Sequence, residues 1–166
     1  VTLIFAGLPD IFESEGYDRK HMKMPSCQLK VINEVCKVAK KSVIALHNGS
    51  PIEMPFVDDV DAILECYLGG QAVGGAQYDI LFGDKSPSGK LAETFPLKLE
   101  DNPSYLNFPG CRNDVNYAED IFVGYRYYDK KKMNVLFPFG FGLSYSEFKY
   151  DNLKLSKEEI NENEEL

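Results

Sequence analysis

Short, continuous apolar runs alternate with amphipathic stretches in the first part of the chain. A run at residues 2–6 leads into Gly7-Leu8-Pro9-Asp10, a turn by its glycine and proline content, and then into a polar loop. After Pro25, Ser26 can cap a helix whose apolar residues recur every three or four positions. These residues are Leu29, Ile32, Val35, Cys36 and Ala39. A second apolar run, at residues 43–46, follows directly and predicts another strand.

The same alternation continues toward the middle of the chain. A third apolar run at residues 62–67 precedes a glycine-rich turn, and a second helix follows, with Gly83 as its stop signal. The apolar residues of this helix are Val73, Ala76, Ile80 and Leu81. A fourth strand-like run covers residues 91–95. Continuous apolar strands are typical of a parallel sheet covered on both faces, so the pattern predicts an α/β fold.

The composition changes beyond Pro96. Of the 21 aromatic residues, 13 lie between Tyr105 and Tyr150, where we expect core or domain-interface packing rather than a ligand site. Alternation at residues 148–155 predicts an edge strand, and the polar tail 157–166 is expected to be solvated. The predicted fold is therefore a partial, parallel-dominated three-layer α/β sandwich with an aromatic-rich arm and a β stump.

Length and charge narrow the function classes. With 166 residues and 44% hydrophobic content, the chain can form one domain with a buried core. The 26 acidic residues against 18 basic ones give a net charge of −8, which argues against a nucleic-acid partner. No apolar run reaches the roughly 18 residues of a membrane span, so we expect no membrane partner. Because the chain begins with Val1, we expect a piece of a longer protein. The sequence leaves its location unknown, with the cytoplasm as the best guess, and it leaves homo-oligomer formation open.

Metal and cofactor sites have no clear sequence signal. The four cysteines form no C-x-x-C pair, and the two histidines show no ligand spacing with them. The turn at residues 69–75 occupies the position of a phosphate-binding loop, but it matches neither glycine-rich motif and has no basic neighbour. His47, at the end of a buried strand, is interpreted as a core or rim histidine. We expect no metal and no organic cofactor.

The remaining chemistry lies in the acidic loop after the first strand, at the sheet edge where ligands bind in such folds. Glu13 and Glu15 flank Ser14 and precede Asp18 and Arg19. A carboxyl group that donates a proton near neutral pH needs a raised pKa, and a neighbouring negative charge from Asp18 or Glu13 would supply it. Arg19 is expected to pair with Asp18 and fix the loop. Taken alone, such a run is more often a solvated turn than a catalytic one.

Several ordered motifs resemble one family over nearly the whole chain. They are Gly7-Leu8-Pro9, Glu13 to Arg19, Met24-Pro25, Asn48 to Pro51, Gly83-Asp84 with Pro87 to Leu91, Glu119 to Tyr128, and Pro138 to Tyr145. Together they resemble the β-glucosidase type of family 3 glycoside hydrolases. Members of that family have a TIM-like barrel with an aspartate nucleophile, an α/β sandwich that contributes the general acid/base, and often a fibronectin type III domain.

The resemblance implies a domain assignment and a partner. Residues 1–145 would be the later part of the sandwich domain, and residues 146–166 would be the first strand of a fibronectin type III-like domain. The barrel with its aspartate nucleophile is absent from this chain and would be its partner. Alone, the chain is expected to be inactive.

By position, the resemblance assigns the general acid/base to Glu15. Glu13 is its nearest competitor, because both side chains share a face if the loop is extended. Asp18 and Arg19 match the Asp-Arg pair of the family and are assigned to loop positioning. The implied substrates are β-linked glucosides or short oligosaccharides, with β-xylosides as the alternative, and no metal or cofactor is required. A rival interpretation is a structural or sugar-binding module, and a more distant one is nucleotide binding at the glycine-rich turn.

Overall fold

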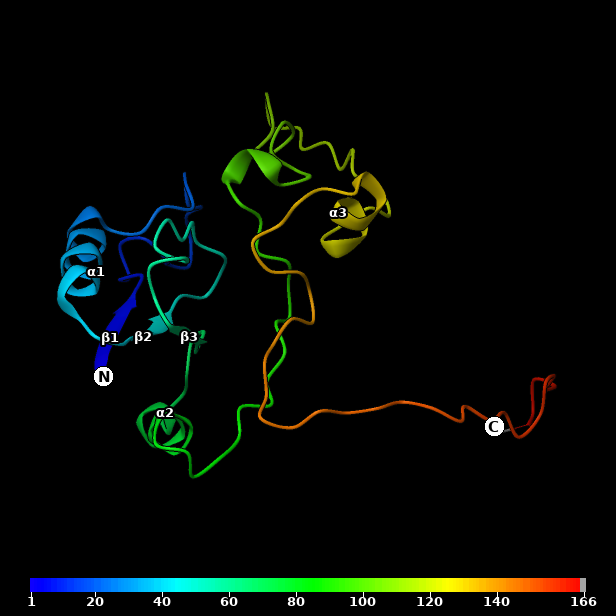
Figure 1. Ribbon diagram of the computed structural model, residues 1–166. Coiled ribbons are helices and arrows are strands. Elements are labelled where there is room, and N and C mark those ends of the chain that lie inside the picture. Colours follow the sequence, from blue (N-terminus) through cyan, green and yellow to red (C-terminus); the bar gives the residue numbers. More distant parts are fainter. Residues whose placement is uncertain (165–166) are drawn as a thin grey trace.

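The computed structural model describes residues 1–164 and has an α/β architecture (Figure 1). A three-stranded, fully parallel sheet has the order β1-β2-β3. The elements are β1 (Thr2–Gly7), α1 (Ser26–Val38), β2 (Ser42–His47), β3 (Ala62–Glu65), α2 (Val73–Leu81), the 3-10 helix η1 (Leu99–Asp101) and α3 (Tyr125–Lys131). The predicted order of strands and helices through α2 is confirmed.

The helix α1 covers one face of the sheet. In the strand register, Ile4 lies beside Ile44 and Ile44 beside Ile63, so the three side chains share that face. Ile32 of α1 is fully buried against them. The predicted stripe of α1 is confirmed by the partial burial of Leu29, Val35 and Cys36 against the same core, whereas Ala39 is the C-cap residue.

The start of α1 differs in detail from the prediction. Pro25 occupies the N-cap position and Ser26 is already helical, without a side-chain capping hydrogen bond. The carbonyl of Pro25 instead accepts hydrogen bonds from the backbone N–H groups of Gln28 and Leu29, at 3.0 and 3.2 Å. Proline fits this place because it fixes the backbone angle φ and has no N–H to leave unpaired.

The opposite face of the sheet is covered less completely. His47 lies on that face, and its Nε2 is 2.8 Å from the Nε2 of Gln77 in α2. Gln77 is the buried residue of α2, whereas the predicted stripe of this helix is only half-buried or exposed. Leu3 and Phe5 of β1 are exposed on the same face. The sheet therefore has a well-packed α1 side and a thinner α2 side.

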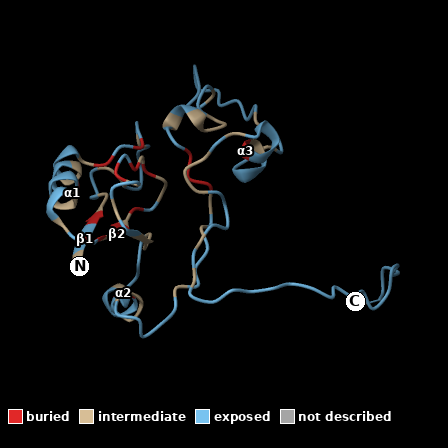
Figure 2. Cartoon of the chain, viewed as in Figure 1, coloured by how far each residue is buried: buried red, intermediate tan, exposed pale blue. Residues whose placement is uncertain are grey.

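The core lies between α1 and the sheet and extends into the loops that follow β1 and β2 (Figure 2). Its loop residues are Met24, Ile52, Met54 and Phe56, each at most 5% exposed. Burial of such side chains contributes about 1.5–3 kcal/mol each to stability. These contacts fix the loops at the carboxyl end of the sheet, where the predicted acidic loop lies.

The predicted fourth strand at residues 91–95 is wrong. This segment runs beside residues 136–141 instead of joining the sheet (Figure 1). The N–H of Phe95 donates to the carbonyl of Phe137 and that of Leu91 to the carbonyl of Phe141, both at 2.8 Å. A strand needs a continuous ladder with a neighbour, and these bonds occur only at separated points.

The aromatic-rich arm lies apart from the sheet (Figure 1) and is mostly exposed. Among its aromatic residues from Tyr105 to Tyr150, only Tyr128 is buried, so core packing within this chain is the wrong expectation for most of them. Some rings stack on one another, as Tyr125 does on Phe139 at a centroid distance of 4.9 Å. Their packing against another domain stays a prediction.

The predicted edge strand at residues 148–155 is not formed, because no other described segment runs beside it to complete a ladder. Residues 146–164 contain no helix or strand and extend away from the sheet as an exposed tail (Figure 2). The assignment of residues 146–166 to a fibronectin type III-like domain stays a prediction, and Glu165 and Leu166 lie outside the described residues. Within residues 1–164, no helix has both the length and the apolar character to cross a membrane.

Candidate active site

The acidic loop, residues 8–24, starts from a fixed point at the end of β1. A Cβ atom on Gly7 would lie 2.1 Å from the carbonyl oxygen of His47, so only glycine allows the two strands to approach this closely. The side-chain amide of Gln28 accepts a hydrogen bond from the N–H of Gly7 at 3.0 Å and donates one to its carbonyl at 2.9 Å. The N–H of Leu8 donates to His47 at 2.9 Å. These contacts fix the position and direction of the backbone where the loop leaves the sheet.

The far end of the loop is anchored as well, whereas its tip is open. Met22 and Met24 are buried, and the carbonyl of Met22 accepts a hydrogen bond from the N–H of Glu53 at 2.9 Å. Across the tip, the hydroxyl of Tyr17 donates to the carbonyl of Asp10 at 2.8 Å. Gly16 has a φ of +98°, which L-residues rarely adopt. The exposed tip is therefore a closed turn rather than an extended strand.

Glu13 points toward the turn after β2. Its two carboxylate oxygens accept hydrogen bonds from the N–H of Gly49 at 3.0 and 2.8 Å, and Oε1 also accepts one from the hydroxyl of Ser50 at 3.1 Å. Nη1 of Arg19 lies 3.6 Å from the same oxygen. The Glu13 side chain is only 16% exposed. Its acceptor capacity is thus largely used within the chain.

Arg19 contacts Glu13 and not Asp18, so the predicted Asp18–Arg19 pair is wrong. Nη1 of Arg19 donates to the hydroxyl of Ser50 at 2.6 Å and to the carbonyl of Pro51 at 3.3 Å. Burial lowers the pKa of the Arg19 guanidinium, and the charge of Glu13 acts in the opposite direction. Asp18 is exposed and forms no ion pair within the described residues. The partners of Arg19 lie on the side of the turn at residues 48–51, whereas Asp18 stays exposed to solvent.

Glu15 lies at the tip of the loop, between Ser14 and Gly16, and is exposed. Within residues 1–164 its side chain forms no hydrogen bond or ion pair. Only its backbone carbonyl is engaged, by the hydroxyl of Ser14 at 3.4 Å. The two glutamates therefore differ in surroundings, because Glu13 is held by the body of the domain and Glu15 is free to contact a group outside the chain.

A second polar layer lies under the turn at residues 48–50. Asn48 is fully buried, and its Nδ2 donates to the carbonyl of Ser50 at 3.0 Å and to Oε2 of Glu65 at 3.2 Å. The other oxygen of Glu65 accepts a hydrogen bond from the N–H of Tyr67 at 2.9 Å. Burial raises the pKa of Glu65 to about 7, with smaller upward effects from the charges of Glu93 and Glu13.

Other predicted features lie elsewhere in the structure. His47 is half-buried and contacts Gln77, which fits its interpretation as a rim histidine. Of the glycine-rich turn, residues 69–72 precede α2, and residues 73–75 already belong to the first turn of this helix. No group of three or more metal-ligating side chains occurs within residues 1–164.

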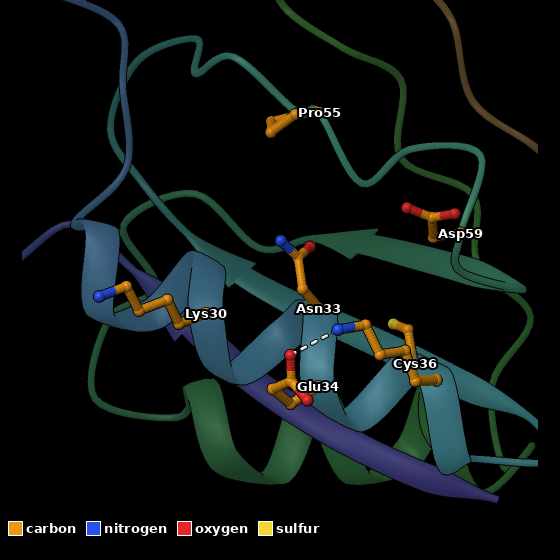
Figure 3. A pocket seen from close by; sticks show the side chains of 7 residues that line it. Lys30, Asn33, Glu34, Cys36, Pro55 and Asp59 are labelled. Atoms are coloured by element: carbon orange, nitrogen blue, oxygen red, sulfur yellow. Dashed lines mark hydrogen bonds and ion pairs between the residues drawn. The ribbon is translucent and has the colours of Figure 1, made fainter.

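One surface cavity lies beside α1, and another lies at the acidic loop. The larger, of about 430 Å³, lies between α1 and the segment of Pro55 and Asp59, and its other lining residues all come from α1 (Figure 3). It contains no residue of the acidic loop. A second cavity, of about 330 Å³, is formed by the loop itself and combines apolar and charged side chains. Its lining residues are Ile11, Phe12, Tyr17, Asp18, Arg19, Lys20 and His21.

Sequence reasoning did not identify Ser50, Asn48 and Glu65 as parts of this site. A signal was present, because the turn at residues 48–51 follows a strand predicted to be parallel to the strand before the acidic loop. The carboxyl ends of parallel strands meet at one edge of the sheet. Glu65 also interrupts an apolar run, and its register partner Leu46 is fully buried.

A protein-family model matches this chain. Residues 1–145 match the model described as the glycosyl hydrolase family 3 C-terminal domain. A thermostable β-glucosidase B from Acetivibrio thermocellus is 56% identical over 163 residues, which are 98% of this chain and 22% of the relative. A probable β-glucosidase I from Aspergillus flavus is 46% identical over 93% of this chain and 18% of its own length. The chain thus spans about a fifth of the length of these curated relatives.

Solved structures resemble the chain over the same region. A β-glucosidase from Kluyveromyces marxianus in complex with glucose matches with a TM-score of 0.85 and 44% identity, over 89% of this chain and 18% of that chain. A family 3 β-glucosidase from Bifidobacterium adolescentis matches with a TM-score of 0.84 and 47% identity, over 86% of this chain and 21% of that chain. These likenesses support the α/β sandwich fold.

Proposed function

We infer the function of this chain from its family: it belongs to glycosyl hydrolase family 3, through the C-terminal domain that residues 1–145 match. We propose that it forms part of a retaining β-glucosidase and supplies the general acid/base, Glu15. The names of its relatives, β-glucosidases from a bacterium and a fungus, support the activity. The observation that carries the residue assignment is the contrast between an engaged Glu13 and an exposed, unpaired Glu15.

The proposed chemistry needs a carboxyl group that can approach the glycosidic oxygen. In the first step, a carboxylate nucleophile attacks the anomeric carbon and forms a glycosyl-enzyme intermediate. The bond from that carbon to the glycosidic oxygen breaks, and Glu15 donates its proton to this oxygen. In the second step, the Glu15 carboxylate takes a proton from water as the water oxygen attacks the anomeric carbon of the intermediate, and the nucleophile leaves as a free carboxylate. A carboxylate already bound by Gly49 and Ser50, as Glu13 is, would have to give up those hydrogen bonds to do this.

The nucleophile of this mechanism has to come from outside the chain. Retaining hydrolysis uses two carboxyl groups about 5–5.5 Å apart, one as nucleophile and one as acid/base. We propose that a barrel domain carries an aspartate nucleophile and most of the residues that hold the non-reducing sugar. The proposed substrates are β-linked glucosides or short oligosaccharides. The contacts of Arg19 with Glu13, Ser50 and Pro51 support its role in loop positioning, and for Asp18 that role stays a prediction.

The test uses a chimeric enzyme in which this chain replaces the matching segment of the A. thermocellus relative, which covers 98% of the chain. We expect the unaltered chimera to hydrolyse aryl β-glucosides. Glu15→Ala should lower kcat/KM for phenyl β-glucoside about 10²–10⁴-fold, the range that general acid/base catalysis contributes. The loss should be much smaller for 2,4-dinitrophenyl β-glucoside, because its leaving group departs without protonation. Added azide should restore turnover by attacking the intermediate without base assistance and give the β-glucosyl azide.

Glu13→Ala is the comparison that separates the two glutamates. If azide rescued Glu13→Ala and not Glu15→Ala, the roles would be exchanged and the assignment to Glu15 would be wrong. If Glu15→Ala mainly raised KM for both substrates, the loop would belong to a sugar-binding module instead. An unaltered chimera without glucosidase activity would contradict the proposed function.

A further inference from the structure

The proposed mechanism does not explain why Glu13, the second glutamate of the acidic loop, is held by so many hydrogen bonds within the chain. Glu13 receives three hydrogen bonds, two from the N–H of Gly49 and one from the hydroxyl of Ser50, and it faces the guanidinium of Arg19. We call these four residues the Glu13 clamp. The clamp joins the acidic loop to the turn after β2, which is 36 residues away from Glu13 in the sequence.

The clamp rests on the sheet through the layer beneath it. The hydroxyl of Ser50 also accepts a hydrogen bond from Arg19, and the carbonyl of Ser50 accepts one from buried Asn48. Asn48 in turn donates to Glu65 at the end of β3. The strands β2 and β3 are hydrogen-bonded to each other, so the clamp has a rigid base. Sites supported by strands hold their geometry better than sites carried by loops alone.

Glu13 is only two residues before Glu15. A chain of two residues spans at most about 7 Å, so the backbone at Glu15 can move only a short way while Glu13 stays bound. Gly16 and the hydrogen bond from Tyr17 to Asp10 close the turn on the other side. The Glu15 backbone is therefore held from both sides, while its carboxyl group is left without a partner in the described chain.

We propose that Glu13 is a positioning residue for Glu15. Its clamped carboxylate sets the place of the loop tip and thereby the distance from the Glu15 carboxyl group to the glycosidic oxygen. This inference rests on the proposed function of Glu15. It gives Glu13 a part in hydrolysis in which it touches neither the sugar nor the leaving group.

Glu13→Gln in the chimeric enzyme is the direct test. An amide has one acceptor oxygen in place of two and no charge, so it cannot satisfy Gly49 and Ser50 as before, and it leaves Arg19 without its counter-ion. A misplaced catalytic group costs about 10²-fold for 1 Å. We expect kcat/KM for phenyl β-glucoside to fall about 10- to 100-fold and that for 2,4-dinitrophenyl β-glucoside to change less than about threefold.

This difference between substrates distinguishes positioning of the acid from general damage. A purely structural role would lower the rates of both substrates by the same factor or reduce the amount of folded enzyme. Asp58→Asn is the matched control, because it also removes one negative charge, is exposed, and forms no side-chain hydrogen bond or ion pair within residues 1–164. We expect it to keep the activity of the unaltered chimera on both substrates.

Two further variants keep the test decisive. Ser50→Ala removes one hydroxyl that joins Arg19 and Glu13, so it should show the same substrate dependence in weaker form even if Glu13→Gln does not fold. In a Glu15→Ala background, Glu13→Gln should cause no further loss on phenyl β-glucoside, because there is no acid left to position.

The outcomes separate this inference from the proposed function. If Glu15→Ala shows the acid/base signature while Glu13→Gln and Ser50→Ala behave like Asp58→Asn, or slow both substrates equally, the positioning role is wrong and the function of Glu15 stands. Additive losses in the double variant would also overturn the positioning role. If Glu15→Ala leaves phenyl β-glucoside hydrolysis intact, the assignment of Glu15 fails, and the positioning role fails with it.

Discussion

At the scale of single residues, Glu65 shows how the support of the site is linked to pH. It follows the apolar residues of β3, and its register partner is Leu46, which is fully buried. Its two oxygens accept hydrogen bonds from Asn48 and Tyr67, which favour the charged form, but burial outweighs them and raises the pKa from 4.5 to about 7. The folded chain therefore holds this proton more tightly than the unfolded chain does.

The sign of the resulting pH dependence follows from linkage. Below pH 4.5 Glu65 is protonated in both the folded and the unfolded state, so it does not change the free energy of unfolding with pH. Between pH 4.5 and about 7 only the unfolded state loses the proton, so the free energy of unfolding falls as the pH rises, and it levels off above about pH 7. We predict that Glu65→Gln, which cannot titrate, removes this fall. Relative to the parent chain, the variant should gain about 2 kcal/mol in unfolding free energy between pH 5 and pH 8.

Urea unfolding of the parent chain and of the variant at several pH values measures this gain. The amide also changes the hydrogen bonds to Asn48 and Tyr67, so the absolute stability shifts, but that shift does not vary with pH. Asn33→Ala changes an exposed residue of α1 that has no titratable group, so its unfolding free energy should run parallel to that of the parent at all pH values. If the unfolding free energies of Glu65→Gln and of the parent changed in parallel with pH, the predicted link between Glu65 protonation and stability would be wrong.

At the scale of elements, α1 stabilises the domain through a narrow stripe of apolar side chains that are buried against the sheet. Its N-terminal end is joined to β1 by the amide of Gln28, and its middle is buried on the sheet by Ile32. The outer side is exposed, as for Val31 and Val38. Because β1 carries the acidic loop, packing of α1 on the sheet also determines where the loop begins.

We predict that Ile32→Ala lowers the unfolding free energy by about 2–5 kcal/mol, because it leaves a cavity in the centre of the core. Val31→Ala is the control on the neighbouring position, which is 57% exposed. It should stay within about 0.5 kcal/mol of the parent. Denaturant unfolding followed by far-UV circular dichroism gives both values, and a similar small effect for the two variants would show that α1 is not packed as described.

At the scale of the whole molecule, the chain combines a well-packed sheet with large exposed apolar surfaces. Leu3 and Phe5 are exposed on the thinner face of the sheet, and the arm exposes most of its aromatic side chains. The loop likewise exposes Glu15, whose side chain forms no hydrogen bond or ion pair within residues 1–164. The relatives that carry the β-glucosidase name are about five times longer than the matching region.

We predict that the purified chain of 166 residues has no glycosidase turnover by itself. Hydrolysis with retention needs the nucleophile as well as the acid/base, and we propose that a barrel domain supplies the nucleophile. Incubation with 4-nitrophenyl β-glucoside should release nitrophenol no faster than buffer does. Release that is abolished by Glu15→Ala would show that a nucleophile lies within the chain and would contradict the proposed division of labour.

The sequence by itself determined the order of elements through α2, the buried stripe of α1 and the place of the acidic loop. These features depend on hydrophobic periodicity and on turn residues, and both are visible within a short segment of the sequence. The resemblance in the motifs also identified the family and singled out Glu15.

Only the tertiary structure decided which charged groups of the loop are paired and which is free. Arg19 is next to Asp18 in sequence but pairs with Glu13, because Glu13 and Arg19 meet at a turn that strand order brings beside the loop. Residues 91–95 have the composition of a strand, yet their hydrogen bonds go to residues 136–141. Ser50, which contacts both Glu13 and Arg19, is 31 residues from Arg19, and residues 136–141 are also distant from residues 91–95. A local pattern contains no information about a contact that forms only when the strands assemble.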